Sequence, residues 1–404
     1  MTLDPLNAFL HLEPQEGPGP TIGVKDVIDV AGMPTTAASR ILRRIPERDA
    51  DCIARLRAVG ARIVGKQNTH EFAYGALTTS PHFGPARNPW NTDHVCGGSS
   101  GGSGAAVAAG LVDVSIGTDT AGSVRIPAAF CGVTGIKPTT GLVPTGGMFP
   151  TSWTFDTIGP LARTAEECVW ALEVMAGRPI ELREPGDLRV GVVESLFERA
   201  DPRVAAVCEE ALRGLPGRHE PVEIPLHDEI TTILQLVLLP EATAAHLHWL
   251  RTRLADYGAD VRARLLAGLF LPSTAHVTGL RARRFATAEY ERALGSYDLL
   301  VAPAMPILPP RLDAIPDDYR LLLIPYNSPA SLWGVPAASV PCGFVDGLPV
   351  GLSLVGRRGE DGTVLGVARA YQRATDWHER RPPLAFDAST REVVYNRQSL
   401  SKGV

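Results

Sequence analysis

The hydrophobic positions of this chain alternate between the two-residue period of strands and the three- to four-residue period of helices. Residues 22–30 follow a strand-like pattern. Asp49 is placed to cap a helix that Gly60 ends, and residues 61–64 predict the strand that follows. This alternation predicts an α/β fold in which helices pack on both faces of a sheet.

The middle of the chain continues the alternation with smaller residues. Residues 105–110 are small and apolar and predict a buried helix that approaches its neighbours closely, and residues 112–116 predict a short strand. Thr164 and Glu167 form a capping-box pattern ahead of a helix that Gly177 closes.

The rest of the chain is less regular. Residues 188–193 predict a strand, and residues 200–290 are rich in Ala, Leu and Arg at helical spacing. Residues 297–310 and 323–343 are apolar and interrupted by prolines, which predicts buried strands and pocket loops. Residues 387–404 form a polar tail that we expect to be poorly ordered.

Three short segments carry the candidate chemistry. Residues 97–104 read GGSSGGSG, residues 117–125 read GTDTAGSVR, and Lys25 lies upstream in the segment GVKD. A serine hydroxyl needs a base, and a lysine can serve if burial or nearby positive charge keeps it neutral. A second serine can relay the proton, and a turn of small residues exposes backbone N–H groups to an oxyanion. The set predicts serine hydrolysis of an amide without histidine.

Together with the segment CGVTGIKPT at residues 131–139, these loops resemble the amidase signature family, serine hydrolases with a Ser-cisSer-Lys triad. The resemblance runs from about residue 20 to about residue 380 and includes the segment GLPVG at residues 347–351. It implies one large α/β domain over residues 1–386, with a central mixed β-sheet covered by helices on both faces. It also implies a hydrolase acting on linear amide bonds.

The resemblance assigns roles residue by residue. It implies that Ser123 is the nucleophile, Ser99 the relay and Lys25 the base. The implied oxyanion hole is the backbone of Thr120, Ala121, Gly122 and Ser123, supported by Ser100, Asp119 and Arg125. Ala121 stands where the family more often has glycine, and the segment ahead of Lys25 is shorter than is usual in the family.

The sequence says less about the substrate. Segments that border the site in the family contain these large apolar residues: Met148, Phe149, Trp153, Phe155, Tyr326 and Trp333. They favour an apolar or aryl acyl group, although each could equally belong to the core. No arginine stands out as a partner for a substrate carboxylate, but residues 240–290 contain several that folding could bring close.

Two other enzyme classes fit parts of the pattern. Residues 97–101 match the G-x-S-x-G elbow of α/β-hydrolase esterases, which would make Ser99 the nucleophile but leave Lys25 without a role. The amide-hydrolysing subunit of a tRNA-dependent amidotransferase shares the fold and triad of the family. Residues 141–156 look more like those of the stand-alone amidases, which we therefore take as the main interpretation.

Composition excludes several partners. The net charge of −5 leaves no basic footprint, so we expect neither nucleic acid nor a membrane surface as a partner. We see no apolar run long enough to cross a bilayer and no signal peptide, and we expect a cytoplasmic protein. The expected partner is a small-molecule amide, and a homodimer is common in the family.

Neither cysteine nor metal chemistry is expected. The six cysteines are scattered without paired spacing, which predicts reduced thiols. His246 and His248 would share a face only on a strand, and their surroundings are helical. We therefore expect no metal site and no cofactor, and we expect activity that chelators do not change.

Overall fold

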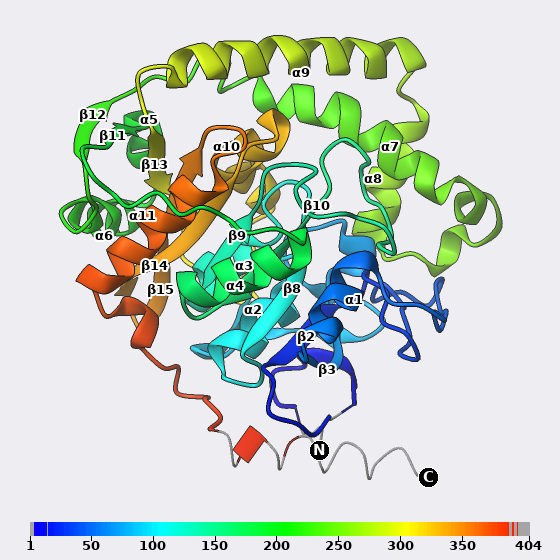
Figure 1. Ribbon diagram of the computed structural model, residues 1–404. Helices are drawn as coiled ribbons and strands as arrows, with labels where there is room; N and C mark the ends of the chain where they lie inside the picture. The colour runs from blue at the N-terminus through cyan, green and yellow to red at the C-terminus, as the bar shows by residue number, and fades with distance from the viewer. Residues whose placement is uncertain (1–3, 14, 388–389, 392–393, 395–404) are drawn as a thin grey trace.

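A mixed sheet of eleven strands runs through the molecule (Figure 1). The computed structural model describes residues 4–13, 15–387, 390–391 and 394. From one edge to the other, the strand order is β1-β3-β2-β8-β10-β9-β14-β15-β13-β11-β12. In chain order, these strands are β1 (Phe9–Leu12), β2 (Thr21–Lys25), β3 (Arg62–Gln67), β8 (Val114–Asp119), β9 (Thr134–Lys137), β10 (Thr157–Ala162), β11 (Arg189–Val192), β12 (Arg218–Pro221), β13 (Leu299–Pro303), β14 (Ala337–Val345) and β15 (Leu348–Gly356).

Helices flank this sheet, which confirms the predicted mixed α/β fold. The helices of the described residues are α1 (Asp51–Ala58), α2 (Gly101–Ala108), α3 (Arg125–Cys131), α4 (Ala165–Ala176), α5 (Glu194–Glu198), α6 (Pro202–Leu212), α7 (Ile230–Thr252), α8 (Ala259–Leu269), α9 (Ser273–Leu294), α10 (Tyr319–Trp333) and α11 (Asp361–Ala374). Short 3₁₀ turns are η1 (Glu71–Ala73), η2 (Leu254–Asp256) and η3 (Trp377–Glu379). Two small hairpins are formed by β4 (Thr79–Ser80) with β5 (Gly84–Pro85) and by β6 (Arg87–Asn88) with β7 (Asn91–Val95).

The pairing of β2 with β8 determines where the site forms. These strands run parallel, with Ile22 opposite Val114 and Val24 opposite Ile116. The carboxyl ends of parallel strands meet at the same edge of a sheet, where α/β folds place their chemistry. Lys25 and Thr118 therefore come together although they lie far apart in the sequence.

The local predictions have mixed outcomes. The capping box is confirmed: Thr164 accepts a hydrogen bond from the Glu167 amide, and Gly177 ends the helix with a φ of 69°. The helix near residue 53 forms, but the predicted cap is wrong. Its N-cap is Ala50, because the Asp49 carboxylate instead accepts a hydrogen bond from the Ala31 amide at 2.8 Å.

The largest error concerns residues 323–343, for which strands and loops were predicted. Residues 319–333 form helix α10, with Pro325 and Pro329 inside it, and only β14 follows as a strand. Each proline removes one helical hydrogen bond. All residues from Tyr326 to Trp333 are buried, so tertiary packing outweighs the low helix propensity of proline.

Helix α7 is long and apolar enough to cross a bilayer by length and composition alone, contrary to the expectation that no such run exists. Half of its most apolar window is buried inside the protein. It packs against α8, α9 and α10, and Figure 1 shows α7, α8 and α9 grouped above the central sheet. These contacts fit a core helix better than a membrane span. Most of the tail predicted for residues 387–404 lies outside the described residues.

Candidate active site

Lys25 lies at the end of β2 and is completely buried. Its Nζ donates to Ser99 Oγ at 2.7 Å, to Thr118 Oγ1 at 2.7 Å and to the Thr118 carbonyl oxygen at 3.3 Å. Burial lowers the pKa of Lys25 to about 7, although the charges of Asp119 and Asp156 oppose this shift. A substantial fraction of this amine is therefore neutral near neutral pH.

Ser99 lies just before α2, and its backbone is held in place by hydrogen bonds to its carbonyl oxygen. The peptide bond between Gly98 and Ser99 is cis. The Ser99 carbonyl oxygen accepts hydrogen bonds from the His70 amide at 3.0 Å, Thr69 Oγ1 at 2.8 Å and Thr78 Oγ1 at 3.1 Å. These contacts fix the loop so that the Ser99 hydroxyl faces Lys25.

The turn between β8 and α3 is organised by a buried ion pair. Arg125 Nη2 lies 2.9 Å from Asp119 Oδ1, and Arg125 Nε lies 3.0 Å from Asp119 Oδ2. Burial raises the pKa of Asp119, but the Arg125 guanidinium, the charge of Lys137 and the Gly122 amide together outweigh this and lower it to about 2. Arg125 also donates to the Asn327 carbonyl oxygen at 2.7 Å and to Ser331 Oγ at 3.1 Å, which ties this turn to α10.

The backbone amides of the turn differ in whether they donate a hydrogen bond within the protein. The Gly122 amide donates to Asp119 Oδ1 at 2.7 Å, so it is already used within the protein. Positive φ in the turn falls on Gly122, at 121°, and not on Ala121. The alanine therefore sits at an ordinary backbone conformation. Within the described part of the chain, no hydrogen-bond acceptor is found for the amides of Thr120, Ala121 and Ser123.

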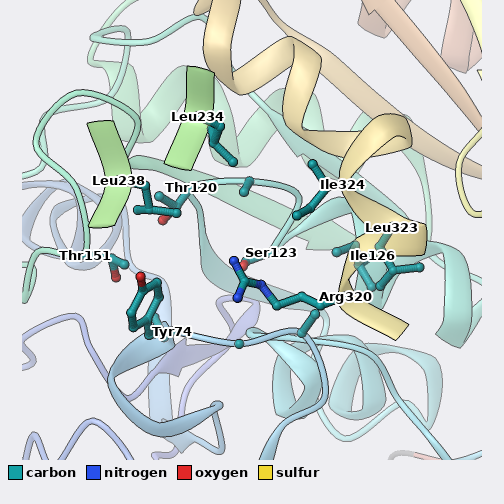
Figure 2. Close-up of a pocket in the computed structure, with 14 residues that line it drawn as sticks. Tyr74, Thr120, Ser123, Ile126, Thr151, Leu234, Leu238, Arg320, Leu323 and Ile324 are labelled. Atoms are coloured by element: carbon teal, nitrogen blue, oxygen red, sulfur yellow. The ribbon is translucent and has the colours of Figure 1, made fainter. Parts of the chain in front are cut away.

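Ser123 lies in this turn and lines a small cavity that is partly open to solvent. Figure 2 shows Ser123 in the middle of the lining residues, with Leu234 and Leu238 of α7 on one side and Ile324 of α10 on the other. Among the described residues, no hydrogen bond joins Ser99 Oγ to Ser123 Oγ. The hydrogen bonds that start at Lys25 thus reach Ser99 but do not continue to Ser123.

The six large apolar residues named from the sequence as candidates for the substrate pocket are Met148 and five aromatic residues. None of the six lines the cavity that contains Ser123. Trp153 is 62% exposed, while Tyr326 and Trp333 line a separate apolar cavity behind α10. Phe149 packs against an aromatic group around His246, and Phe155 is fully buried. The cavity is instead bounded by aliphatic side chains of α7 and α10, whose packing could not be read from the sequence.

Four residues at this site were not singled out from the sequence. Thr118 contacts Lys25, and Asp156 accepts a hydrogen bond from Thr120 Oγ1 at 2.6 Å. Both lie in segments that carry the family resemblance, so that signal could have found them. Arg320 and Tyr74 line the cavity and have no motif around them.

The sequence profile of the Amidase family matches residues 18–365. The A subunit of the glutamyl-tRNA(Gln) amidotransferase from Roseiflexus castenholzii is 37% identical over 92% of this chain and 85% of its own. A crystal structure of an amidase superposes with a TM-score of 0.86 at 33% identity, covering 91% of this chain and 92% of that one. The corresponding amidotransferase chain from Thermotoga maritima gives a TM-score of 0.82 at 33% identity, covering 95% of this chain and 91% of that one.

Proposed function

This chain belongs to the amidase family, and from that premise we propose that it hydrolyses the carbon–nitrogen bond of a carboxylic amide through an acyl-enzyme on Ser123. The observation that carries the proposal is the buried lysine of lowered pKa, hydrogen-bonded to Ser99, near a cavity that Ser123 lines. A buried base, a hydroxyl relay and an accessible nucleophile are the parts that acyl transfer requires.

The proton path follows from the contacts of Lys25. A neutral amine has two N–H groups and one lone pair. The two oxygens of Thr118 accept both N–H groups, which leaves the lone pair for the Ser99 hydroxyl proton. Ser99 Oγ in turn takes the proton of Ser123 Oγ as Ser123 attacks the amide carbonyl. The missing link between the two hydroxyls closes when substrate binds, as is common for catalytic contacts.

The developing oxyanion would be held by the free backbone amides of Thr120, Ala121 and Ser123. The Gly122 amide serves the turn itself, by donating to Asp119. When the carbon–nitrogen bond breaks, the proton returns through Ser99 to the leaving nitrogen. Water then attacks the acyl-enzyme by the same route, giving a carboxylate and ammonia or an amine.

The physiological unit is a second question. The relatives from Roseiflexus castenholzii and Thermotoga maritima are components of amidotransferases, and they support such a role better than the stand-alone amidase expected from the sequence. Rapid hydrolysis by the isolated chain would support the stand-alone enzyme. Turnover that needs a co-purifying protein would support the amidotransferase role. Both a cytoplasmic location and a homodimer remain proposals.

Fluorophosphonate labelling followed by intact-mass analysis tests the nucleophile. We expect a single adduct on the wild-type protein, no adduct on Ser123→Ala, and a slower adduct on Ser99→Ala. Ser103→Ala is the matched control, because Ser103 lies in the same glycine-rich segment but donates to Gln67 at 2.8 Å, away from the cavity. An adduct lost with Ser99→Ala alone would instead support the esterase elbow.

A further inference from the structure

A cation shares the cavity with Ser123. Arg320 is the second residue of α10, and its side chain lines the same cavity as the serine. Figure 2 shows the guanidinium reaching from α10 toward the middle of the cavity, in the direction of Ser123. Within the part of the chain that the structure describes, no hydrogen bond or ion pair holds this guanidinium.

The neighbouring arginine is engaged with protein groups. Arg264 donates to the Tyr74 carbonyl oxygen and to Asp260 Oδ2, the latter at 3.0 Å. Burial and the positive charge of Arg264 lower the pKa of Arg320, but a guanidinium keeps its charge at neutral pH. Arg320 is therefore a charged group in the cavity of Ser123. The Asp260 carboxylate acts on it from a distance, but Asp260 lies outside the cavity and makes its hydrogen bonds to His70 and Arg264. Such an arrangement is costly unless a ligand supplies the anion.

A second polar group in the same cavity also lacks a partner. The Tyr74 hydroxyl is buried and has no hydrogen-bond partner among the described residues. Tyr74 is only 5% exposed and lines the cavity with Arg320 and Ser123. A buried hydroxyl without a partner costs free energy, which a ligand oxygen in the cavity would offset.

The other residues that line the cavity disfavour a substrate that carries an ammonium group as well as a carboxylate. Apart from Arg320, the walls are mostly aliphatic, with Ile126, Leu234, Leu238 and Leu323 among them. Among the described residues that line the cavity, none carries a carboxylate. A substrate ammonium group would therefore find no acidic partner here, whereas an alkyl chain would be well accommodated.

From this arrangement we propose that the substrate is an amide whose acyl portion carries one carboxylate, which Arg320 binds as a charged pair and the Tyr74 hydroxyl supports. The class is a monoamide of an aliphatic dicarboxylic acid, in preference to a neutral amide or an amide that also bears an ammonium group. This inference rests on amide hydrolysis at Ser123. It makes Arg320 a residue that determines specificity, acting on the substrate away from the reacting bond.

Matched pairs of substrates test the proposal. Succinamate, glutaramate and adipamate are compared with butanamide, pentanamide and hexanamide, which have the same chain lengths and no carboxylate. The wild-type protein is expected to prefer the best acid amide by about 10- to 100-fold in kcat/KM, which is the usual range for a hydrogen bond to a charged group. Arg320→Met should remove this preference by slowing the acid amide alone, and Arg320→Lys should restore part of it. Tyr74→Phe should reduce the preference by a few-fold.

The control is Arg284→Met, because Arg284 lies exposed on α9 and does not line the cavity. This substitution should leave kcat/KM unchanged for both substrates of each pair. The proposal is overturned if Arg320→Met keeps the wild-type preference, if the neutral amides are the better substrates, or if L-glutamine outcompetes glutaramate.

A competition assay separates failure of this inference from failure of the proposed function. Glutaramate and pentanamide are each added during fluorophosphonate labelling of Ser123. Stronger protection by glutaramate, lost in Arg320→Met, supports the inference even where neither compound is hydrolysed. Equal protection overturns it while the labelled serine still supports hydrolysis. If Ser123 takes no label and no amide is cleaved, hydrolysis at Ser123 fails, and the inference fails with it.

Discussion

Burial of Lys25 makes a quantitative prediction for the pH dependence of the reaction. If only the neutral amine accepts the proton, kcat/KM should rise tenfold per pH unit at low pH and level off above the pKa of about 7. At pH 5 the rate should then be about 100-fold below its plateau. An ordinary lysine, with a pKa of 10.5, would still be rising at pH 9. The pH at which the profile bends therefore measures how far burial has lowered the pKa of this lysine.

A second lysine could produce a similar bend. Burial, together with the charge of Arg125, also lowers the pKa of Lys137 to about 7, but its Nζ donates to the Pro138 carbonyl oxygen and contacts neither serine. The assay is kcat/KM against pH from 5 to 10 for the wild type, Lys25→Met and Lys137→Met. We expect Lys137→Met to keep the bend, and Lys25→Met to lose about 10²- to 10⁴-fold in rate along with the bend.

The charge of Asp156 allows the direction of the pKa shift of Lys25 to be tested. The Asp156 carboxylate raises the pKa of Lys25, opposing burial. Asp156→Asn removes that charge, so the bend should move to lower pH. A flat profile between pH 5 and 9, or a bend that disappears only in Lys137→Met, would refute the assignment of Lys25 as the base. A shift to higher pH in Asp156→Asn would refute the electrostatic reasoning.

Two further predictions concern the turn that carries Ser123. Arg125→Met leaves a buried carboxylate unpaired and should lower the free energy of unfolding by about 3 to 5 kcal/mol, measured by urea denaturation. Arg203→Met breaks an exposed pair instead, and a comparable loss there would contradict the argument. Gly122→Ala should abolish both Ser123 labelling and turnover, because an added Cβ would lie 2.5 Å from Asn327 Cβ at a φ of 121°. Unchanged labelling in this variant would mean that the turn can adopt another conformation.

The alternation of strands and helices was predictable because it depends on local periodicity. The capping box at Thr164 and the glycine that ends α4 follow from side chains close in sequence. Helix α10 was missed because two prolines argue locally against a helix, and only its burial in the folded protein outweighs them. Local pattern therefore located most elements and failed where tertiary packing decides.

The candidate site likewise contains residues that local motifs indicate and residues that only the folded structure places. Ser99, Ser123 and Lys25 were found through motifs, yet nothing local distinguishes Lys25 from an exposed lysine. Its burial depends on the parallel pairing of β2 with β8, whose residues lie far apart in the sequence. Arg320 has no motif around it, and it lies outside residues 240–290, the region noted for several arginines that folding could bring close to the site. Residues that tune a cavity are placed by the whole fold, so a sequence pattern rarely shows them.

Asp119 connects the structure of the turn to the state of the base. Its carboxylate accepts hydrogen bonds from the Gly122 and Val124 amides, which shape the turn, and its charge raises the pKa of Lys25. In the proposed mechanism, this carboxylate orders the turn of Ser123 while its charge favours the protonated form of Lys25, which cannot accept a proton. The Arg125 guanidinium pairs with this carboxylate and leaves the amide contacts in place. In the proposed mechanism, burial therefore has to lower the pKa of Lys25 by more than the charge of Asp119 raises it, and the resulting pKa of about 7 meets that condition.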